Sequence, residues 1–362
     1  MIDFRYHLVS IVAVFLALAI GIVLGSTELQ GNALNLLNST SNSLRSQYAA
    51  ASSERDAYAA QASAGEQFAQ AEEPTLLASL LKGDRIVLIT EPGAQDSVIS
   101  GVKQAAADAG ATVTGQISLQ PRFNDTSGET QSALSSTNGS AAQAAGVSLS
   151  TSGANQQTFY QQQAAQLIAS AILTTSASAG AQTSSPANAQ TSSQTSLPAS
   201  AAQALLSSYA QAGFLSVSGQ PTVRATLAVV ITPQSPPSDG ASDPASQVLV
   251  TLTQQLAGAS AATVVAGGVS GSGTASAMGV LRSSDVSSRV STIDDADTTF
   301  GQITVIQALA TQLAGGKAAS YGVDGATGIG PTPAPTPSAS VSPSSAPAAK
   351  STAKAKTPKG KK

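Results

Sequence analysis

An uncharged run close to the N-terminus constrains this chain more than any other feature. Leu8–Leu24 reads LVSIVAVFLALAIGIVL, and Gly25 extends it to the lower limit for a helix that crosses a bilayer. Arg5 precedes the run, and the next arginine or lysine after it is Arg45. Because basic residues stay on the cytoplasmic side of a membrane span, residues 1–27 are predicted to form a cytoplasmic N-terminus and a transmembrane anchor. The sequence thus predicts a single-pass protein embedded in the lipid of the cell membrane, with its main domain outside the cytoplasm.

The same run also fits a cleaved signal peptide, with Val23 and Gly25 as the small residues before a cut at Ser26. The length of the run and the lack of a lysine-rich start favour a retained signal anchor. Small residues that recur at every fourth position form one face of the predicted helix and include a GxxxG pattern, namely Ala13, Ala17, Gly21 and Gly25. Such a face packs membrane helices against each other, although small residues are also common in any alanine-rich chain.

A helical stalk is predicted over 28–73, because this polar stretch contains no proline. Ser41 and Arg55 interrupt its heptad pattern, and Asn and Ser are poor helix formers. We therefore expect a coiled-coil-like helix that is supported by the anchor or by a partner, either a second copy or another envelope protein. The residues near a and d positions are Leu34, Leu37, Leu44, Tyr48, Ala51, Tyr58 and Ala62.

The remainder up to residue 325 predicts an extracytoplasmic domain of the α/β class. Pro74 is expected to end the stalk, and a short helix is expected over Leu76–Lys82. Short apolar runs then alternate with helical patterns, which indicates a doubly wound, mostly parallel sheet with helices on both faces. The predicted strands are Arg85–Thr90, Thr112–Leu119, Leu227–Thr232, Thr263–Gly267 and Arg289–Ile293, and the longer helices are Gln95–Ala109, Phe159–Leu173, Ala199–Ala212, Asp243–Ala257 and Thr298–Leu313.

Three segments lack this periodicity. Residues 124–153 and 176–198 are rich in Ser, Thr, Ala and Gln, which predicts loops or disordered insertions, and the Pro/Ser/Lys-rich residues 326–362 predict a disordered tail. Six lysines lie in that tail, so the rest of the chain has 11 basic against 20 acidic residues. Without aromatic residues or a binding fold we expect no nucleic acid at this tail, and an anionic cell-wall polymer is the favoured partner.

The residue types present exclude several kinds of chemistry. The chain has no cysteine, and its single histidine, His7, lies beside the anchor. Thiolate metal sites, cysteine nucleophiles and a Ser-His-Asp triad in the domain are therefore excluded. We expect no enzyme, no cofactor and no tight copper site, because only Met1 and Met278 remain as soft ligands.

Ligands of doubly wound sheets bind beyond the carboxyl ends of the strands. The candidate binding positions there are Glu91, Gly93, Gly267, Gly268, Asp294, Asp295 and Asp297. Alternatives exist for each group. Glu91 before Pro92 fits a turn, GGVSGSG lacks the ending of a phosphate loop, and Asp297 fits the cap of the following helix. The three aspartates leave room for weak, unselective binding of a divalent cation.

Two longer stretches carry a family resemblance: MIDFRYHLVSIVAVFLALAIGIVLGS at the start and VSTIDDADTTFGQITVIQALATQLAGGKAASYG near the end. Both resemble the actinobacterial family named for mycobacterial copper transport protein B, MctB, as do ITEPGA around Glu91 and AGATVTG from Ala109. The low-complexity insertions and the lysine tail depart from that family. The resemblance implies an anchored envelope protein with a stalk, an α/β domain and a role in copper transport, efflux or tolerance. The alternative is a scaffold protein that oligomerises through its anchor and stalk and recruits partners.

Overall fold

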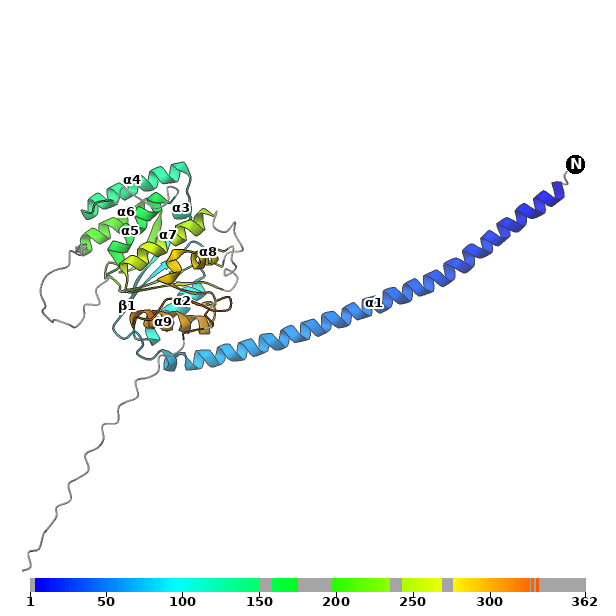
Figure 1. The fold of residues 1–362 in the computed structure, drawn as a ribbon, viewed down its shortest axis with the longest axis horizontal. Coiled ribbons are helices and arrows are strands. Elements are labelled where there is room, and N and C mark those ends of the chain that lie inside the picture. The colour runs from blue at the N-terminus through cyan, green and yellow to red at the C-terminus, as the bar shows by residue number, and fades with distance from the viewer. Residues whose placement is uncertain are drawn as a thin grey trace, which may run out of the picture.

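The computed structural model describes residues 4–149, 158–174, 197–234, 243–268, 276–325, 327–328 and 330–331, without the side chains of 26–34. A single helix, α1 (Phe4–Leu77, 74 residues), leads into an α/β domain (Figure 1). At about 1.5 Å per residue this helix is roughly 110 Å long. Its first part, Phe4–Gly25, has a mean hydropathy of 2.9 and no buried residue, so it is apolar and long enough to cross a membrane.

Within the described ranges, seven strands form one sheet in the order β3-β2-β1-β4-β5-β6-β7. Only the pair β2–β3 is antiparallel, so the predicted mostly parallel α/β fold is confirmed. The chain first winds from β1 toward β2 and later from β4 toward β7, so the direction of winding switches between β1 and β4. The strands are β1 (Arg85–Thr90), β2 (Thr112–Leu119), β3 (Leu215–Gly219), β4 (Leu227–Ile231), β5 (Ala262–Ala266), β6 (Ser291–Ile293) and β7 (Ser320–Tyr321).

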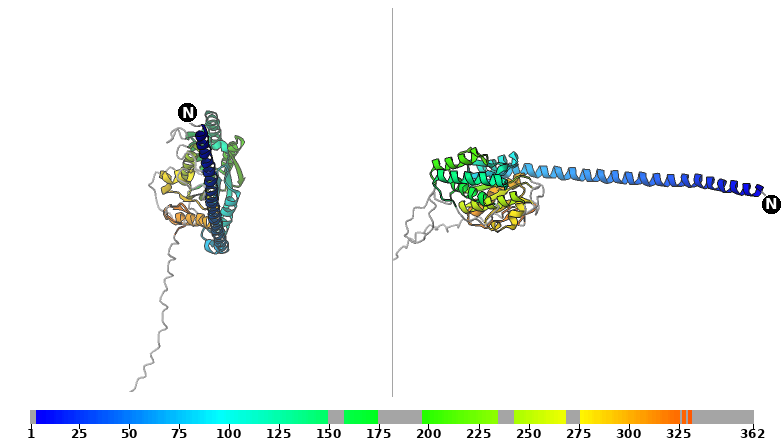
Figure 2. Two further views of the ribbon diagram at one scale, coloured as in Figure 1. Left: turned by 90° about the vertical axis from the view of Figure 1, so that its right-hand side faces the viewer. Right: turned by 90° about the horizontal axis from the view of Figure 1, so that it is seen from above.

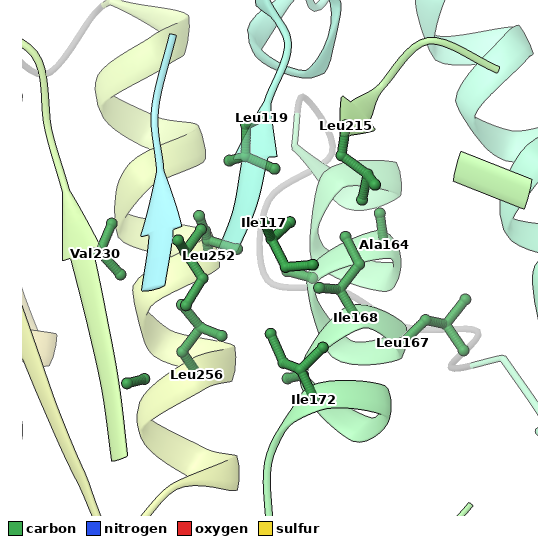
Figure 3. Packing of buried hydrophobic residues seen from close by; sticks show 14 of the residues in the cluster. Ile117, Leu119, Ala164, Leu167, Ile168, Ile172, Leu215, Val230, Leu252 and Leu256 are labelled. Atoms are coloured by element: carbon green, nitrogen blue, oxygen red, sulfur yellow. The ribbon is translucent and has the colours of Figure 1, made fainter. Parts of the chain in front are cut away.

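The sheet separates two apolar cores. Alternate residues of β1 supply both, because successive side chains of a strand point to opposite faces: Ile86 and Leu88 to one core, Val87 and Ile89 to the other. Figure 1 shows α2 and α9 on one side and α4 to α7 on the other. Figure 3 shows side chains of β2, α5 and α7 meeting in the second core. The helices are α2 (Asp96–Asp108), α4 (Gly128–Ala145), α5 (Phe159–Ile172), α6 (Ala199–Gln211), α7 (Pro244–Ala259), α8 (Ala277–Ser283) and α9 (Thr299–Leu313).

The prediction of a loop over 124–153 is wrong for most of that segment. Following the short α3 (Pro121–Asn124), it contains the whole of α4, whose first turn is capped by the Ser127 side chain. Polar composition hid the buried face of this helix, which includes Asn138. Asn138 donates to the carbonyl of Tyr160 at 2.9 Å and accepts from the Tyr209 hydroxyl at 2.7 Å. A fully paired asparagine can therefore occupy a core position that hydropathy assigns to solvent.

Pro74 does not end the stalk helix, which continues to Leu77. Its neighbours Glu73 and Leu77 are buried in the domain, so packing holds the last turn despite the lost amide donor. The helix predicted over Leu76–Lys82 is also wrong beyond Leu77, since turns follow there. Most of the predicted insertion 176–198 and nearly all of the predicted tail 326–362 lie outside the described residues.

The last part of the stalk is fixed against the domain. The Glu66 carboxylate accepts hydrogen bonds from the backbone N–H of Thr299, at 2.9 and 3.2 Å, and from its hydroxyl, at the first turn of α9. Farther along, Leu81 N donates to the carbonyl of Ala109 near the start of β1. The helix therefore passes the carboxyl edge of the sheet first and ends near its amino edge. Consequently the carboxyl edge faces along α1 toward the N-terminus of the chain (Figures 1 and 2).

Replacing Glu66 with alanine is expected to loosen this junction. The substitution leaves an orphan N–H at the start of α9 and removes a negative charge from its positive end, a change worth about 1 kcal/mol. Limited proteolysis should cut the Glu66→Ala protein faster between residues 60 and 80. Glu72→Ala is the matched control, because no hydrogen bond joins that side chain to the domain in the described structure. Equal cleavage rates for the two variants would contradict the role given to Glu66.

Candidate functional site

The sequence-predicted binding positions lie along the carboxyl edge of the sheet, as expected, but they form two groups. Glu91 and Gly93 follow β1, Gly267 and Gly268 follow β5, and the aspartates follow β6. Since neighbouring strands lie about 4.8 Å apart, three spacings place the end of β1 about 14 Å from the end of β6. The structure therefore does not bring Glu91 and the aspartates into one cluster.

Glu91 occupies the point where the direction of winding switches. It is 6% exposed, and its backbone N–H donates to the carbonyl of Ile231 on β4 at 2.9 Å. Its Oε1 atom is buried without a hydrogen-bond partner. Burial, and to a smaller extent the charge of Asp243, the N-cap of α7, together raise the pKa of Glu91 to about 8. At neutral pH this carboxyl is therefore protonated and able both to donate and to accept a hydrogen bond.

The turn after Glu91 is held by its neighbours. Gly93 has φ +86°, a left-handed conformation that favours glycine, and a side-chain carbon placed there would lie 3.4 Å from Pro233. The hypothesis that Glu91 is only a turn residue accounts for this backbone. It does not account for the unpaired buried carboxyl.

Two glutamines that the sequence analysis missed connect the two groups. Gln95 Nε2 donates to Gln234 Oε1 at 2.6 Å, and Gln234 Nε2 donates to Asp297 Oδ2 at 2.9 Å. A side-chain carbon at Gly268 would lie 2.3 Å from Gln234 Nε2, so a larger residue there would displace this amide. No pattern in the sequence marks two glutamines 139 positions apart as neighbours.

Asp294 forms hydrogen bonds that stabilise the fold. Both of its oxygens are used: Arg282 Nη2 donates to Oδ2 at 2.9 Å, Val323 N donates to Oδ1 at 2.7 Å, and Asp324 N donates to Oδ2 at 3.1 Å. The aspartate is completely buried. Its arrangement fixes the segment after β7 rather than presenting a ligand.

Asp295 differs from Asp294 because its Oδ1 atom is buried and without a partner. Burial, together with the charges of Asp294 and Asp297, raises the pKa of Asp295 to about 6. The hypothesis that Asp297 caps the next helix is wrong, since the Thr298 hydroxyl accepts from Gly301 N at 3.1 Å. In the described part of the chain, no three histidine, cysteine, aspartate or glutamate side chains are grouped to hold a metal ion.

Nothing in the described part of the chain covers the small-residue face of the apolar segment of α1. Ala13, Ala17 and Gly21 are exposed on α1, and a side-chain carbon at Gly21 or Gly25 would meet no atom within 4 Å. This face is therefore open to lipid or to another helix.

Comparison with known proteins gives a consistent result. The family described as "Copper transport outer membrane protein, MctB" matches residues 1–331. "Copper transporter MctB" of Mycobacterium tuberculosis (strain ATCC 25618 / H37Rv) is 30% identical over 324 residues, which cover 89% of this chain and 96% of the relative. The protein of the same name from Mycobacterium leprae (strain TN) is 29% identical over 331 residues, 91% of this chain and 99% of that one. The family match spans the anchor, the stalk and the α/β domain alike, and the chain belongs to the MctB family of copper transport proteins.

Proposed function

We propose that this protein is a membrane-anchored component of copper transport in the cell envelope, with its N-terminus in the cytoplasm and its domain outside. The observation that carries the proposal is the uninterrupted helix from Phe4 to Leu77, which joins an apolar segment without buried residues to the domain without a hinge. Arg5 before the apolar segment supports the orientation. The names of the relatives supply the link to copper.

The stalk determines how the domain is presented. From Gly25 to Glu66 the helix rises about 60 Å, so the domain stands well clear of the bilayer surface. The carboxyl edge of the sheet faces back toward the membrane. This edge contains Glu91 and the hydrogen-bonded side chains of Gln95, Gln234 and Asp297. In this geometry the candidate site faces any other protein that projects from the same membrane.

We propose further that the protein acts on transport without holding copper tightly itself. Soft or imidazole ligands are what copper prefers, and the chain beyond the anchor offers only Met278. That methionine lies on α8, points into the core and is 2% exposed. The domain is accordingly suited to organising other components rather than to passing copper between its own side chains.

Deletion of the gene tests this function. We expect more cell-associated copper and poorer growth at raised copper in the deletion strain, with cell-associated zinc as the control metal. The full chain should restore both, whereas a chain that lacks residues 4–25 should restore neither, because its domain is no longer held at the membrane. Unchanged copper content and tolerance after deletion would reject the proposal.

A second candidate is a scaffold that recruits an envelope protein, or an anionic wall polymer at its lysine-rich end. The large apolar side chains left exposed on the stalk favour it, among them Leu37, Leu44 and Tyr48. Affinity capture from detergent-solubilised membranes should then retain one defined partner. The deletion strain would show a wall defect with normal copper content.

A further inference from the structure

We infer that two copies of this chain pair in parallel through one face of the stalk. The inference rests on the anchored topology proposed above and goes beyond it by naming the partner and the register. The face consists of a and d positions of one heptad register, and we call it the stalk seam: Leu37, Leu44, Tyr48, Ala51 and Tyr58.

The stalk seam is continuous with a face that the protein already buries. Two and three a/d positions beyond Tyr58 in the same register are Gly65 and Ala69. Gly65 lies against the ring of Phe300 on α9, with 3.9 Å to a side-chain carbon placed at the glycine, and Ala69 is 2% exposed. The domain thus covers the C-terminal stretch of this stripe. Nothing in the described chain covers the remainder, where Leu44 is 66% and Tyr48 79% exposed.

A second copy fits this surface better than an unrelated partner. A solitary helix rich in Asn and Ser is marginal in water, whereas apolar a and d positions pack against their own equivalents in a parallel pair. Both copies leave the membrane in the same direction, so their stalks run parallel. The stalk seams of the two copies then pack against each other in register, so that each residue faces its own equivalent.

The charged interruption of the seam also suits a parallel pair. Arg55 occupies an a position and Glu54 the preceding g position, and these two positions face each other across a parallel two-stranded coil. Among the described residues of one chain, Arg55 forms an ion pair with its neighbour Asp56, at 2.7 Å between side chains that are 76% and 65% exposed. Such an exposed pair holds the arginine weakly and leaves it free to turn toward Glu54 of the second copy.

The pair must separate before the domain. At Gly65 the seam face is occupied by α9 of the same chain, so a second stalk cannot follow it there. The geometry points to a zipper that ends between Tyr58 and Gly65 and leaves two domains side by side.

Single cysteines test the pairing in the full chain, because the protein has none of its own. Ala51→Cys and Tyr58→Cys place a thiol on the stalk seam, and Ser53→Cys places one on the opposite face. Mild oxidation of membranes should convert most of the two seam variants, and at least tenfold less of Ser53→Cys, to a covalent dimer. Cross-links at both positions 51 and 58 require a parallel, in-register pair, and Phe68→Cys, beyond the point of separation, should behave like Ser53→Cys.

Adding Leu44→Asp and Tyr48→Asp to the Ala51→Cys chain should lower the dimer yield at least tenfold. Alkaline extraction of the same membranes reports anchoring separately, so loss of the anchor and loss of pairing are distinguishable. Equal yields at positions 51 and 53, or no dimer at 51 from a protein that stays in the membrane, would overturn the inference.

Discussion

The Glu91→Gln protein is expected to be more stable than the unchanged protein above pH 8. Glu91 is buried, and its pKa lies at about 8 in the fold instead of 4.5. Between these values the folded protein keeps a proton that the unfolded chain has lost, so stability falls as the pH rises, by about 1.4 kcal/mol per unit. The accumulated loss above pH 8 is roughly 5 kcal/mol, while below pH 4.5 the contribution is fully present. Glutamine stays neutral at every pH and avoids this loss.

Urea unfolding of the full chain in detergent at pH 5, 7 and 9 measures the effect. The unfolding free energy of Glu91→Gln minus that of the unchanged protein should increase as the pH rises. Glu129→Gln is the matched control, since Glu129 is exposed in the first turn of α4. A difference that stays constant from pH 5 to 9 would show that Glu91 is ionised in the fold.

Arg282→Ala is expected to cost about 3 to 5 kcal/mol of unfolding free energy, because it leaves the buried Asp294 without its positive partner. The two side chains are 14% and 0% exposed and joined at 2.9 Å. Arg282 also donates to Thr292 Oγ1 and to the carbonyl of Tyr321, so the segment after β7 should loosen as well.

Thermal and urea unfolding at pH 7 check this expectation. Arg289→Ala is the control for removal of an arginine nearby, as Arg289 is exposed. Adding Asp294→Asn to Arg282→Ala should recover part of the loss, because it removes the unpaired charge. Equal unfolding free energies of the Arg282→Ala and Arg289→Ala proteins would contradict this expectation, because they would mean that Asp294 loses its ion pair without a loss of stability.

Several parts of the molecule could be predicted from sequence because local patterns determine them. A long uncharged apolar run inside a bilayer satisfies its backbone groups as a helix, and α1 is helical throughout this run. The strands Arg85–Thr90 and Thr112–Leu119 were predicted with their observed bounds. Alternation of such strands with helices is enough to indicate a parallel, doubly wound sheet. The helical stalk was predicted from the absence of proline and from apolar residues near heptad a and d positions.

Other features depend on contacts between distant segments, and only the tertiary structure decided them. Helix α4 was missed because its buried face holds Asn138, which needs Tyr209 as a partner. Side-chain hydrogen bonds link Gln95 to Gln234 and Gln234 to Asp297. These residues lie in three different loops, and no local sequence pattern connects them. The bond from Thr299 to Glu66 fixes which edge of the sheet faces the membrane anchor. Sequence periodicity indicates which face of a single segment is buried. Hydrogen bonds between distant segments depend instead on which segments the tertiary fold brings together.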